Sequence, residues 1–277
     1  MHVESFLDPA DFLAAALPLA SASAPLDAFV RAWSDGVARM PPERCFMAVA
    51  YAPAPCGFAL QRDEGPVVLG ACSEGAAHAL AERLAADHPL LEGVSGQEAP
   101  CLAFCDRWRA VTGRTHRLRH RMRNYVMTEL RAPPCVAGAM RVAGPGDREW
   151  LRAQLRAFSD EARVAMSDER IARYVDERLA EKSYRIWQTH EGSQAFAGFS
   201  RAGPAASRLA PVYTVPAARR HGYAAALVGA LCAELLAQRP RVFLVSDLAN
   251  ATSNGLYRRL GFEPLDDTVS FDFVAGR

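Results

Sequence analysis

The 277-residue sequence lacks several features that would assign a protein to a class at once. No apolar run approaches the roughly 20 residues that a membrane-spanning helix needs. The 32 Lys and Arg nearly balance the 31 Asp and Glu, so no net field favours nucleic acid or a membrane surface as a partner. Neither a G-x-S-x-G elbow nor an H-E-x-x-H helix occurs, which leaves hydrolase chemistry without support.

The N-terminus lacks the positive start of a secretory signal. The stretch FLAAALPLASASA (residues 12–24) has the apolar and small residues of such a signal, but Glu4, Asp8 and Asp11 precede or open it. We interpret it as an amphipathic helix that begins near Asp8, with Pro9 in its first turn. The seven cysteines have no paired spacing, which indicates reduced thiols, and we expect a cytoplasmic protein.

The stretch RAPPC (residues 131–135) contains a Pro-Pro pair that stops regular structure. It predicts a boundary between an N-terminal domain, residues 1–135, and a second domain, residues 136–277. Short β-like runs and alanine-rich helical stretches alternate in the first half. We expect an α/β (α+β) protein: a mixed, mostly antiparallel sheet flanked by helices in the second domain, after a smaller or degenerate α/β domain.

The second half has clearer signals for its elements. Apolar spacing, turn residues and prolines predict strands and helices in alternation. The expected order is a strand, turn and helix over 139–162, a helix over 168–180, a hairpin over 183–202, a strand over 207–216, a helix over 222–236, a strand over 241–248, a short helix over 253–262 and a strand over 270–274.

The stretch PAARRHGYAAAL (residues 216–227) places arginines between a strand and a long helix. Helix N-termini expose unpaired N–H groups and a partial positive charge, which favour a phosphate. Gly222 and Ala224 would let a ligand approach the backbone, and Arg219 and Arg220 would add charge-assisted contacts. The alternative is a helix start with solvated arginines. G-x-x-x-x-G-K-[ST] and G-x-G-x-x-G are both absent, which argues against a P-loop or dinucleotide site.

A second motif follows this loop. Asn250 lies 26 residues after Ala224 and opens N-x-x-x-N-x-x-Y-x-x-x-G-F, which contains Asn254 and Tyr257. Together, R-x-x-G-x-A and this motif resemble the GNAT superfamily of acyl-CoA-dependent N-acyltransferases over residues 209–262. The phrases APVYTVP and DLANATSNGLYRRLGF look like a subgroup with a degenerate N-terminal half, and residues 1–135 fit that outline weakly, without a second cofactor loop.

The resemblance implies an N-acetyltransferase that moves an acetyl group from acetyl-CoA, its co-substrate, to a primary amine by direct attack in a ternary complex. Backbone N–H groups of one loop would hold the pyrophosphate: Arg219, Arg220, His221, Gly222, Tyr223 and Ala224. The end of the preceding strand would pair with the pantetheine arm: Val212, Tyr213, Thr214 and Val215. One N–H of that strand would polarise the thioester carbonyl.

The resemblance also assigns roles in the second motif. Asn250 and Asn254 would contact the arm of the cofactor. Tyr257 would be the general acid that protonates the departing thiolate, since a phenol of pKa near 10 can donate to a thiolate as its charge develops. The alternative for Tyr257 is a core aromatic residue.

Several assignments stay open at this level. No carboxylate lies in residues 208–215, so the general base is left among Tyr213, Glu191, His190 and Asp247. The acceptor is a small amine or a peptide. A non-catalytic acyl-CoA-binding regulatory protein is the alternative function, and a homodimer is left open.

Two further patterns indicate structure more than function. Cys101, Cys105, His116 and His120 approach a zinc-finger spacing, but the central gap is short, and the histidines lie in a run that resembles a strand, so we expect no metal site. Arginines alternate on one face of that run, which could grip RNA or an acidic substrate. We favour a solvated or acid-paired face: Arg117, Arg119, Arg121 and Arg123.

Overall fold

The computed structural model describes residues 1–20, 45–62, 65–164, 166–202 and 205–276. The chain forms two compact units. Unit 1 comprises residues 1–125, 245–251 and 264–277, and unit 2 comprises residues 126–244 and 252–263. This division differs from the predicted boundary at residue 135. Two segments of the C-terminal half belong to unit 1, which contains the larger number of residues.

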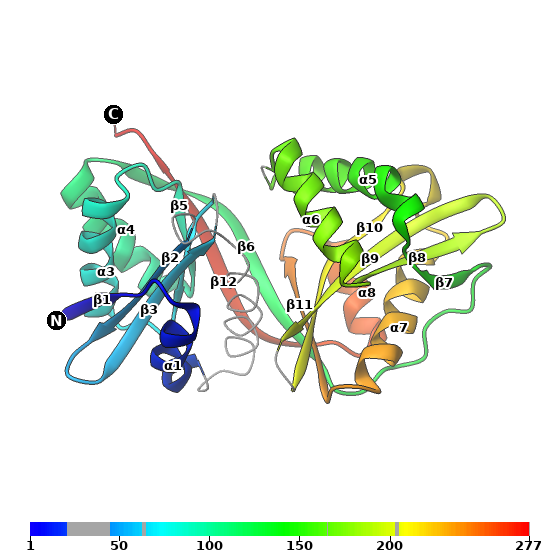
Figure 1. The fold of residues 1–277 in the computed structure, drawn as a ribbon, viewed down its shortest axis with the longest axis horizontal. Coiled ribbons are helices and arrows are strands. Elements are labelled where there is room, and N and C mark those ends of the chain that lie inside the picture. The colour runs from blue at the N-terminus through cyan, green and yellow to red at the C-terminus, as the bar shows by residue number, and fades with distance from the viewer. Residues whose placement is uncertain (21–44, 63–64, 165, 203–204, 277) are drawn as a thin grey trace. The chain divides into compact units, whose positions relative to one another are not determined.

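Unit 1 is a mixed sheet with helices on both faces (Figure 1). Its strand β2 (Cys45–Tyr51) is buried along its length and alternates between two cores. Phe46, Ala48 and Ala50 join the core under α3 (Glu74–Asp87) and α4 (Glu98–Thr112), whereas Met47 and Val49 join the core under α1 (Pro9–Ala20). The sheet order is β1 (His2–Ser5), β2, β3 (Pro55–Arg62), β4 (Val67–Gly70), β5 (Gly93–Gly96), β12 (Glu263–Val274) and β6 (Thr115–Met127).

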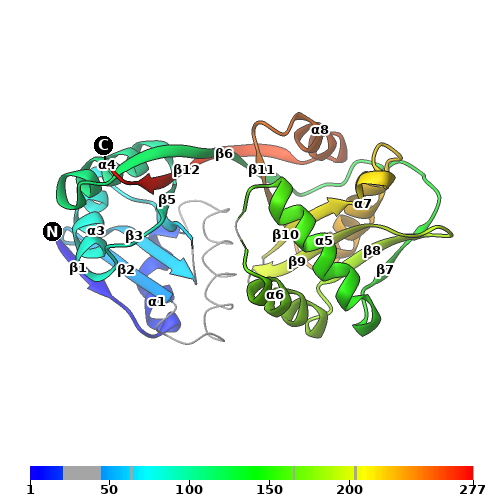
Figure 2. The ribbon, with the colours of Figure 1, turned by 90° about the horizontal axis from the view of Figure 1, so that it is seen from above.

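The strands of unit 2 also pair in both parallel and antiparallel fashion, within the one 12-stranded sheet that the described residues form. Helices α5 (Arg148–Glu161) and α6 (Asp168–Ala180) cover one face, and α7 (Tyr223–Leu236) covers the other (Figure 2). Tyr184 and Ile186 point into the core under α5 and α6, while Arg185 between them pairs with Glu234 of α7. The sheet order is β11 (Arg241–Asp247), β10 (Ala206–Thr214), β9 (Gly192–Ala202), β8 (Tyr184–Thr189) and β7 (Ala139–Val142), and α8 (Ala251–Leu260) follows β11.

The Pro-Pro segment lies along helix α7 and so belongs to unit 2. A Cβ at Gly229 would come within 2.5 Å of the Pro133 Cβ, so this glycine gives the segment its room. The Arg131 N–H donates to the Leu260 carbonyl at 2.9 Å. The prolines stop regular structure as expected, but the chain has entered unit 2 before it reaches them.

The mixed α/β class and the elements expected in the second half are confirmed. In the first half, α1 begins after Asp8, whose carboxylate accepts the Ala10 N–H at 2.7 Å. The continuation of that stretch beyond residue 20 lies outside the described residues. Strands β1, β3 and β5 had no clear sequence signal. All seven cysteines, each within the described residues, are free thiols, and no described helix has the length and apolarity to span a membrane.

Candidate functional site

Strand β10 separates from β11 at its C-terminal half. The two strands pair in parallel only over residues 206–208 and 241–243, and a bulge between Leu209 and Val212 then shifts the pairing of β10 with β9. The Val215 N–H donates to the Gln194 carbonyl of β9 at 3.0 Å. Because backbone groups alternate along a strand, the N–H groups of Val212 and Thr214 point to the opposite side, where β11 has diverged.

The loop after β10 turns through two residues with left-handed backbone. Arg220 has φ 68° and Gly222 has φ 84°, and helix α7 begins at Tyr223. Gly222 is the N-cap residue and supplies no side-chain cap, so no side chain at this position covers the first-turn N–H groups. A Cβ at Gly222 would lie 3.0 Å from Val136 Cγ1. The start of α7 is thus compact at Gly222, and its first turn receives no cap from the residue at this position.

Arg219 leaves this loop towards the C-terminal end of α5. One of its terminal nitrogens (NH2) donates to both carboxylate oxygens of Glu161 at 2.8 Å each, and its Nε donates to the Thr214 carbonyl at 3.2 Å. The Tyr213 hydroxyl donates to Glu161 Oε1 at 2.7 Å, and the Arg219 guanidinium lies 5.3 Å from the centre of the Tyr213 ring. Glu161, Tyr213 and Arg219 therefore form one polar cluster, the Glu161 cluster.

The charges of the Glu161 cluster shift two pKa values in opposite directions. The Arg219 guanidinium has the largest effect and lowers the pKa of Glu161; burial opposes it, and the Tyr213 hydroxyl lowers the pKa to a smaller extent. Burial and the neighbouring carboxylate raise the pKa of Tyr213 to about 12. Near neutral pH, Glu161 is ionised and Tyr213 is protonated. Tyr213 is thus a hydrogen-bond donor and a poor proton acceptor.

The other loop residues are less constrained. Arg220 and His221 are exposed, and the His221 ring stacks on the Tyr223 ring with centroids 5.6 Å apart. Ala224 is half-buried in the first turn of α7. The six predicted pyrophosphate residues therefore surround one helix start, and Arg219 is the one whose side chain is held by an acid.

Helix α8 carries two of the predicted site residues, Asn254 and Tyr257. Tyr257 is 9% exposed, packs edge-to-face on Phe262 with centroids 5.7 Å apart and lies near Cys232 of α7. Burial raises the pKa of Tyr257 well above its ordinary value. Asn254 is buried as well, at 4% exposure. Both residues belong to unit 2 together with the loop, whereas Asn250 is an exposed residue of unit 1.

The other three residues left open as general bases have partners outside the Glu161 cluster. His190 and Glu191 lie at the exposed turn between β8 and β9, 3.9 Å from each other. Asp247 accepts the Ala249 N–H at 2.8 Å and lies 3.1 Å from His120 Nδ1. Sequence reasoning missed Glu161. The available signal was a carboxylate in the last turn of a helix, where the helix dipole disfavours a negative charge unless a cation compensates it.

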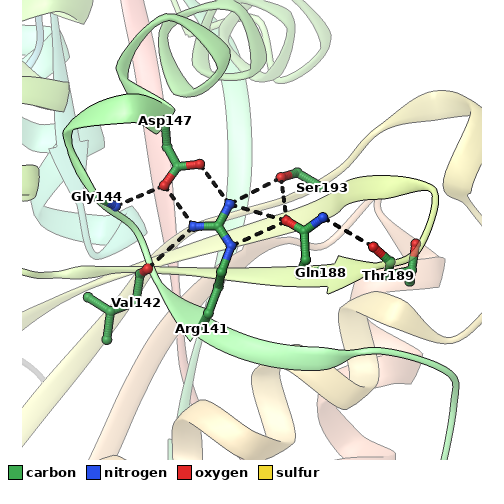
Figure 3. A network of polar contacts seen from close by, with 7 residues as sticks. All are labelled: Arg141, Val142, Gly144, Asp147, Gln188, Thr189 and Ser193. Atoms are coloured by element: carbon green, nitrogen blue, oxygen red, sulfur yellow. Dashed lines mark hydrogen bonds and ion pairs between the residues drawn. The ribbon is translucent and has the colours of Figure 1, made fainter.

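The N-terminal end of α5 is held by a closed polar network (Figure 3). The Arg141 guanidinium of β7 donates to both oxygens of Asp147 at 2.7 Å each and to the Gln188 side-chain oxygen at 3.2 Å. Asp147 also accepts the Gly144 N–H at 2.8 Å, and the Ser193 hydroxyl donates to Gln188 at 3.0 Å. The network joins the N-terminal end of α5 to β7, and Glu161 is the last residue of the same helix.

The four arginines of β6 in unit 1 have acidic partners. Arg121 forms a bidentate pair with Glu98 at 2.5 and 2.9 Å, and Arg123 forms one with Asp267 at 2.7 and 2.8 Å. Arg117 and Arg119 both face Asp272. The acid-paired interpretation of this face is supported.

The four residues of the zinc-finger pattern pack within unit 1 instead. Cys101 and Cys105 are buried in the core under α4. His116 packs edge-to-face on Phe271 with centroids 5.1 Å apart, and His120 contacts Asp247. No group of three metal-ligating side chains occurs in the part of the chain that the structure describes.

Comparisons with known proteins agree with this architecture. Residues 189–270 match the family model described as FR47-like protein, and this segment includes β10, the loop and α8. Over these residues the chain is similar to the FR47-like family. The match covers the elements that place the helix start of α7 beside the open edge of β10. No curated protein matches the chain.

Solved structures share the fold over both units. A GCN5-related N-acetyltransferase from Sphaerobacter thermophilus is 16% identical with a TM-score of 0.65, over 98% of this chain and 95% of that one. A GNAT-family acetyltransferase from Colwellia psychrerythraea is 13% identical with a TM-score of 0.62, over 99% and 100%. A tandem GNAT protein from the clavulanic acid biosynthesis pathway is 13% identical with a TM-score of 0.58, over 100% and 99%. At these identities the likeness concerns the fold.

Proposed function

We propose that the protein is an N-acetyltransferase that uses acetyl-CoA as co-substrate and a primary amine as acceptor. One observation carries the proposal: a helix start without a side-chain cap, with arginines before it, follows a strand on which the Val212 and Thr214 N–H groups face away from β9. A diphosphate and an extended amide-containing arm need those two surfaces side by side.

The chain's residues then have separate tasks. The N–H groups at the start of α7 and the arginines before it bind the pyrophosphate. The N–H groups of Val212 and Thr214 are available to the pantetheine arm and to the thioester oxygen, where they stabilise the negative charge that develops during attack. Asn254 lies on α8 within the same unit and would contact the arm.

The reaction joins an amine nitrogen to the thioester carbonyl carbon and breaks the carbon–sulfur bond, which gives an amide and a thiol. The phenol of Tyr257 donates its proton to the departing sulfur, and the proton that the amine nitrogen loses on forming the amide passes to solvent, from which the phenol is reprotonated. Burial raises the pKa of Tyr257, so the phenol is protonated near neutral pH. Orientation of the two substrates in one ternary complex supplies much of the remaining rate enhancement.

Calorimetry with acetyl-CoA tests the proposal. The wild-type protein is expected to bind acetyl-CoA, and Tyr257→Phe is expected to keep that affinity while amine acetylation falls about 100-fold, the usual contribution of a general acid. Phe262→Leu is the matched control, since it changes the ring beside Tyr257 and removes no hydroxyl. Unchanged turnover in Tyr257→Phe would remove the general-acid role, and absence of acetyl-CoA binding would remove the function.

A non-catalytic acyl-CoA-binding protein is the second candidate, and the burial of Tyr257 favours it. A phenol that is 9% exposed resembles a core aromatic residue. The two candidates differ in one result: acetyl-CoA binding without acetylation of any amine in a broad panel supports the second.

A further inference from the structure

The Glu161 cluster presents a negative charge where the proposed cofactor site needs a positive one. Arg219 is the first residue of the pyrophosphate loop, and both of its contacts to Glu161 are short and use the two carboxylate oxygens. The terminal nitrogen that bonds both carboxylate oxygens and the Nε that bonds the Thr214 carbonyl are not free to pair with a phosphate while these contacts hold. Glu161 and a bound diphosphate therefore compete for the same cation.

The position of Glu161 gives the competition a consequence. The carboxylate lies in the last turn of α5, where the helix dipole opposes it, so it depends on Arg219 for compensation. When Arg219 turns to a diphosphate, Glu161 keeps only the Tyr213 hydroxyl among the two partners of its cluster. An uncompensated carboxylate beside a phenol attracts a cation, and a primary amine at neutral pH is a cation.

We propose that Arg219 pairs with Glu161 while the site is empty. Binding of the diphosphate to Arg219 then frees Glu161 to bind the ammonium group of the acceptor. The inference rests on the proposed function and specifies it in two ways. The acceptor is a cationic amine, and it binds after the cofactor. Glu161 thus positions the acceptor, and Tyr213 orients the carboxylate through its hydrogen bond.

The two side chains suit substitution, because Arg219 is 43% and Glu161 49% exposed. Coenzyme A is titrated by calorimetry into the full-length wild type and into Glu161→Gln, Arg219→Ala and the double variant. Glu149→Gln, at the opposite end of α5 and paired with Arg152 at 3.0 Å, is the matched control. It removes the same charge from the same helix.

Glu161→Gln is expected to bind coenzyme A about twofold to fivefold more tightly than the wild type, the range for one exposed ion pair. Glu149→Gln is expected to match the wild type. In the Arg219→Ala background, Glu161→Gln is expected to have no effect, which separates release of Arg219 from simple loss of a negative charge. Equal affinity of wild type and Glu161→Gln would overturn the release and leave the cofactor assignment intact. No binding by either protein would overturn both.

The acceptor half is tested with methylammonium, the smallest primary ammonium, by saturation-transfer NMR. The signal is expected to be larger with coenzyme A present than without it, to disappear in Glu161→Gln and to persist in Glu149→Gln. A signal that is independent of coenzyme A, or that survives in Glu161→Gln, would overturn the role of Glu161 in binding the acceptor.

Discussion

The two units repeat one order of elements and differ at the start of one helix. Unit 1 runs β2, β3, β4, α3, β5, α4 and β6. Unit 2 runs β8, β9, β10, α7, β11 and α8, and the chain then continues into β12, which belongs to unit 1. In each, three strands pair antiparallel, and the helix after the third leads to a parallel neighbour. The same topology therefore places α3 and α7 in equivalent positions after β4 and β10.

The helix starts differ in charge and in capping. In unit 1 the Ser73 hydroxyl accepts the Ala76 N–H at 3.2 Å, and Glu74 follows in the first turn. In unit 2 Gly222 offers no side chain, and arginines precede it. A capped, acidic helix start repels an anion, while an uncapped, basic one attracts it. The repeated fold thus provides two such positions, and local sequence makes only the second suitable for a diphosphate.

Crowding the open helix start is expected to have the largest effect. Gly222→Glu forces a side chain into left-handed backbone 3.0 Å from Val136 Cγ1 and adds a negative charge. We expect at least about a 100-fold loss of acetyl-CoA affinity by calorimetry, from strain together with lost charge-assisted contacts.

Gly65→Glu is the matched control, because Gly65 also has a positive φ, of 115°, and its Cβ would meet no atom within 4 Å. It lies in unit 1 and is expected to leave acetyl-CoA affinity unchanged. Similar losses in both variants would show that the α7 helix start is not special.

The hydrogen-bonded network around Arg141 and Asp147 contrasts with the start of α7 in the same unit, which has no side-chain cap. Asp147→Asn removes the charge that Arg141 and the Gly144 N–H share, and we expect it to lower the free energy of unfolding by about 1–2 kcal/mol at pH 7. Urea unfolding measures the difference.

The pH dependence of that difference has a defined sign. Arg141 lowers the pKa of Asp147 in the folded protein, so its stabilisation is fully present above the unfolded carboxyl pKa of about 3.9 and is lost as the pH falls through the folded value. The gap between wild type and Asp147→Asn should narrow below pH 4. A gap of constant size would show that packing, not charge, holds the start of α5.

Removal of the helix cap at the start of α3 in unit 1 is expected to have a smaller effect on stability. Ser73→Ala removes the acceptor of the Ala76 N–H and is expected to lower the stability of unit 1 by about 1 kcal/mol in urea unfolding. Acetyl-CoA affinity should not change. A change in acetyl-CoA affinity would indicate that the ligand binds at the start of α3. The starts of α3 and α7 would then not differ in ligand binding.

The smallest effect concerns the arginines of the two units. Arg121→Gln breaks an exposed pair with Glu98 in unit 1, and we expect no measurable shift in the thermal midpoint or in acetyl-CoA affinity. Arg219→Gln, in the loop of unit 2, should weaken acetyl-CoA binding by comparison. Equal behaviour of the two variants in calorimetry would remove the distinction between structural and ligand-binding arginines.

Much of unit 2 could be predicted from the sequence, because its signals are local. The helix over 168–180 matches α6, and Gly222 was expected at the start of α7 because a bare backbone suits a phosphate. The short strands of unit 1 were missed, since β5 contains two glycines in four residues and resembles a turn. The sequence also did not predict that residues 245–251 and 264–277 belong to unit 1. Apolar alternation indicates that a segment is a strand, but it does not say which other strand pairs with it.

The sequence by itself determined the chemistry-bearing motifs and the alternation of helices and strands, because capping residues, prolines and apolar spacing act within a few residues of each other. Only the tertiary structure decided that Glu161 holds Arg219 and Tyr213, 58 and 52 residues further along the chain. It also decided that Tyr257 is buried and that the arginines of β6 have acidic partners. Such pairs form where packing of the sheet and helices brings distant side chains together.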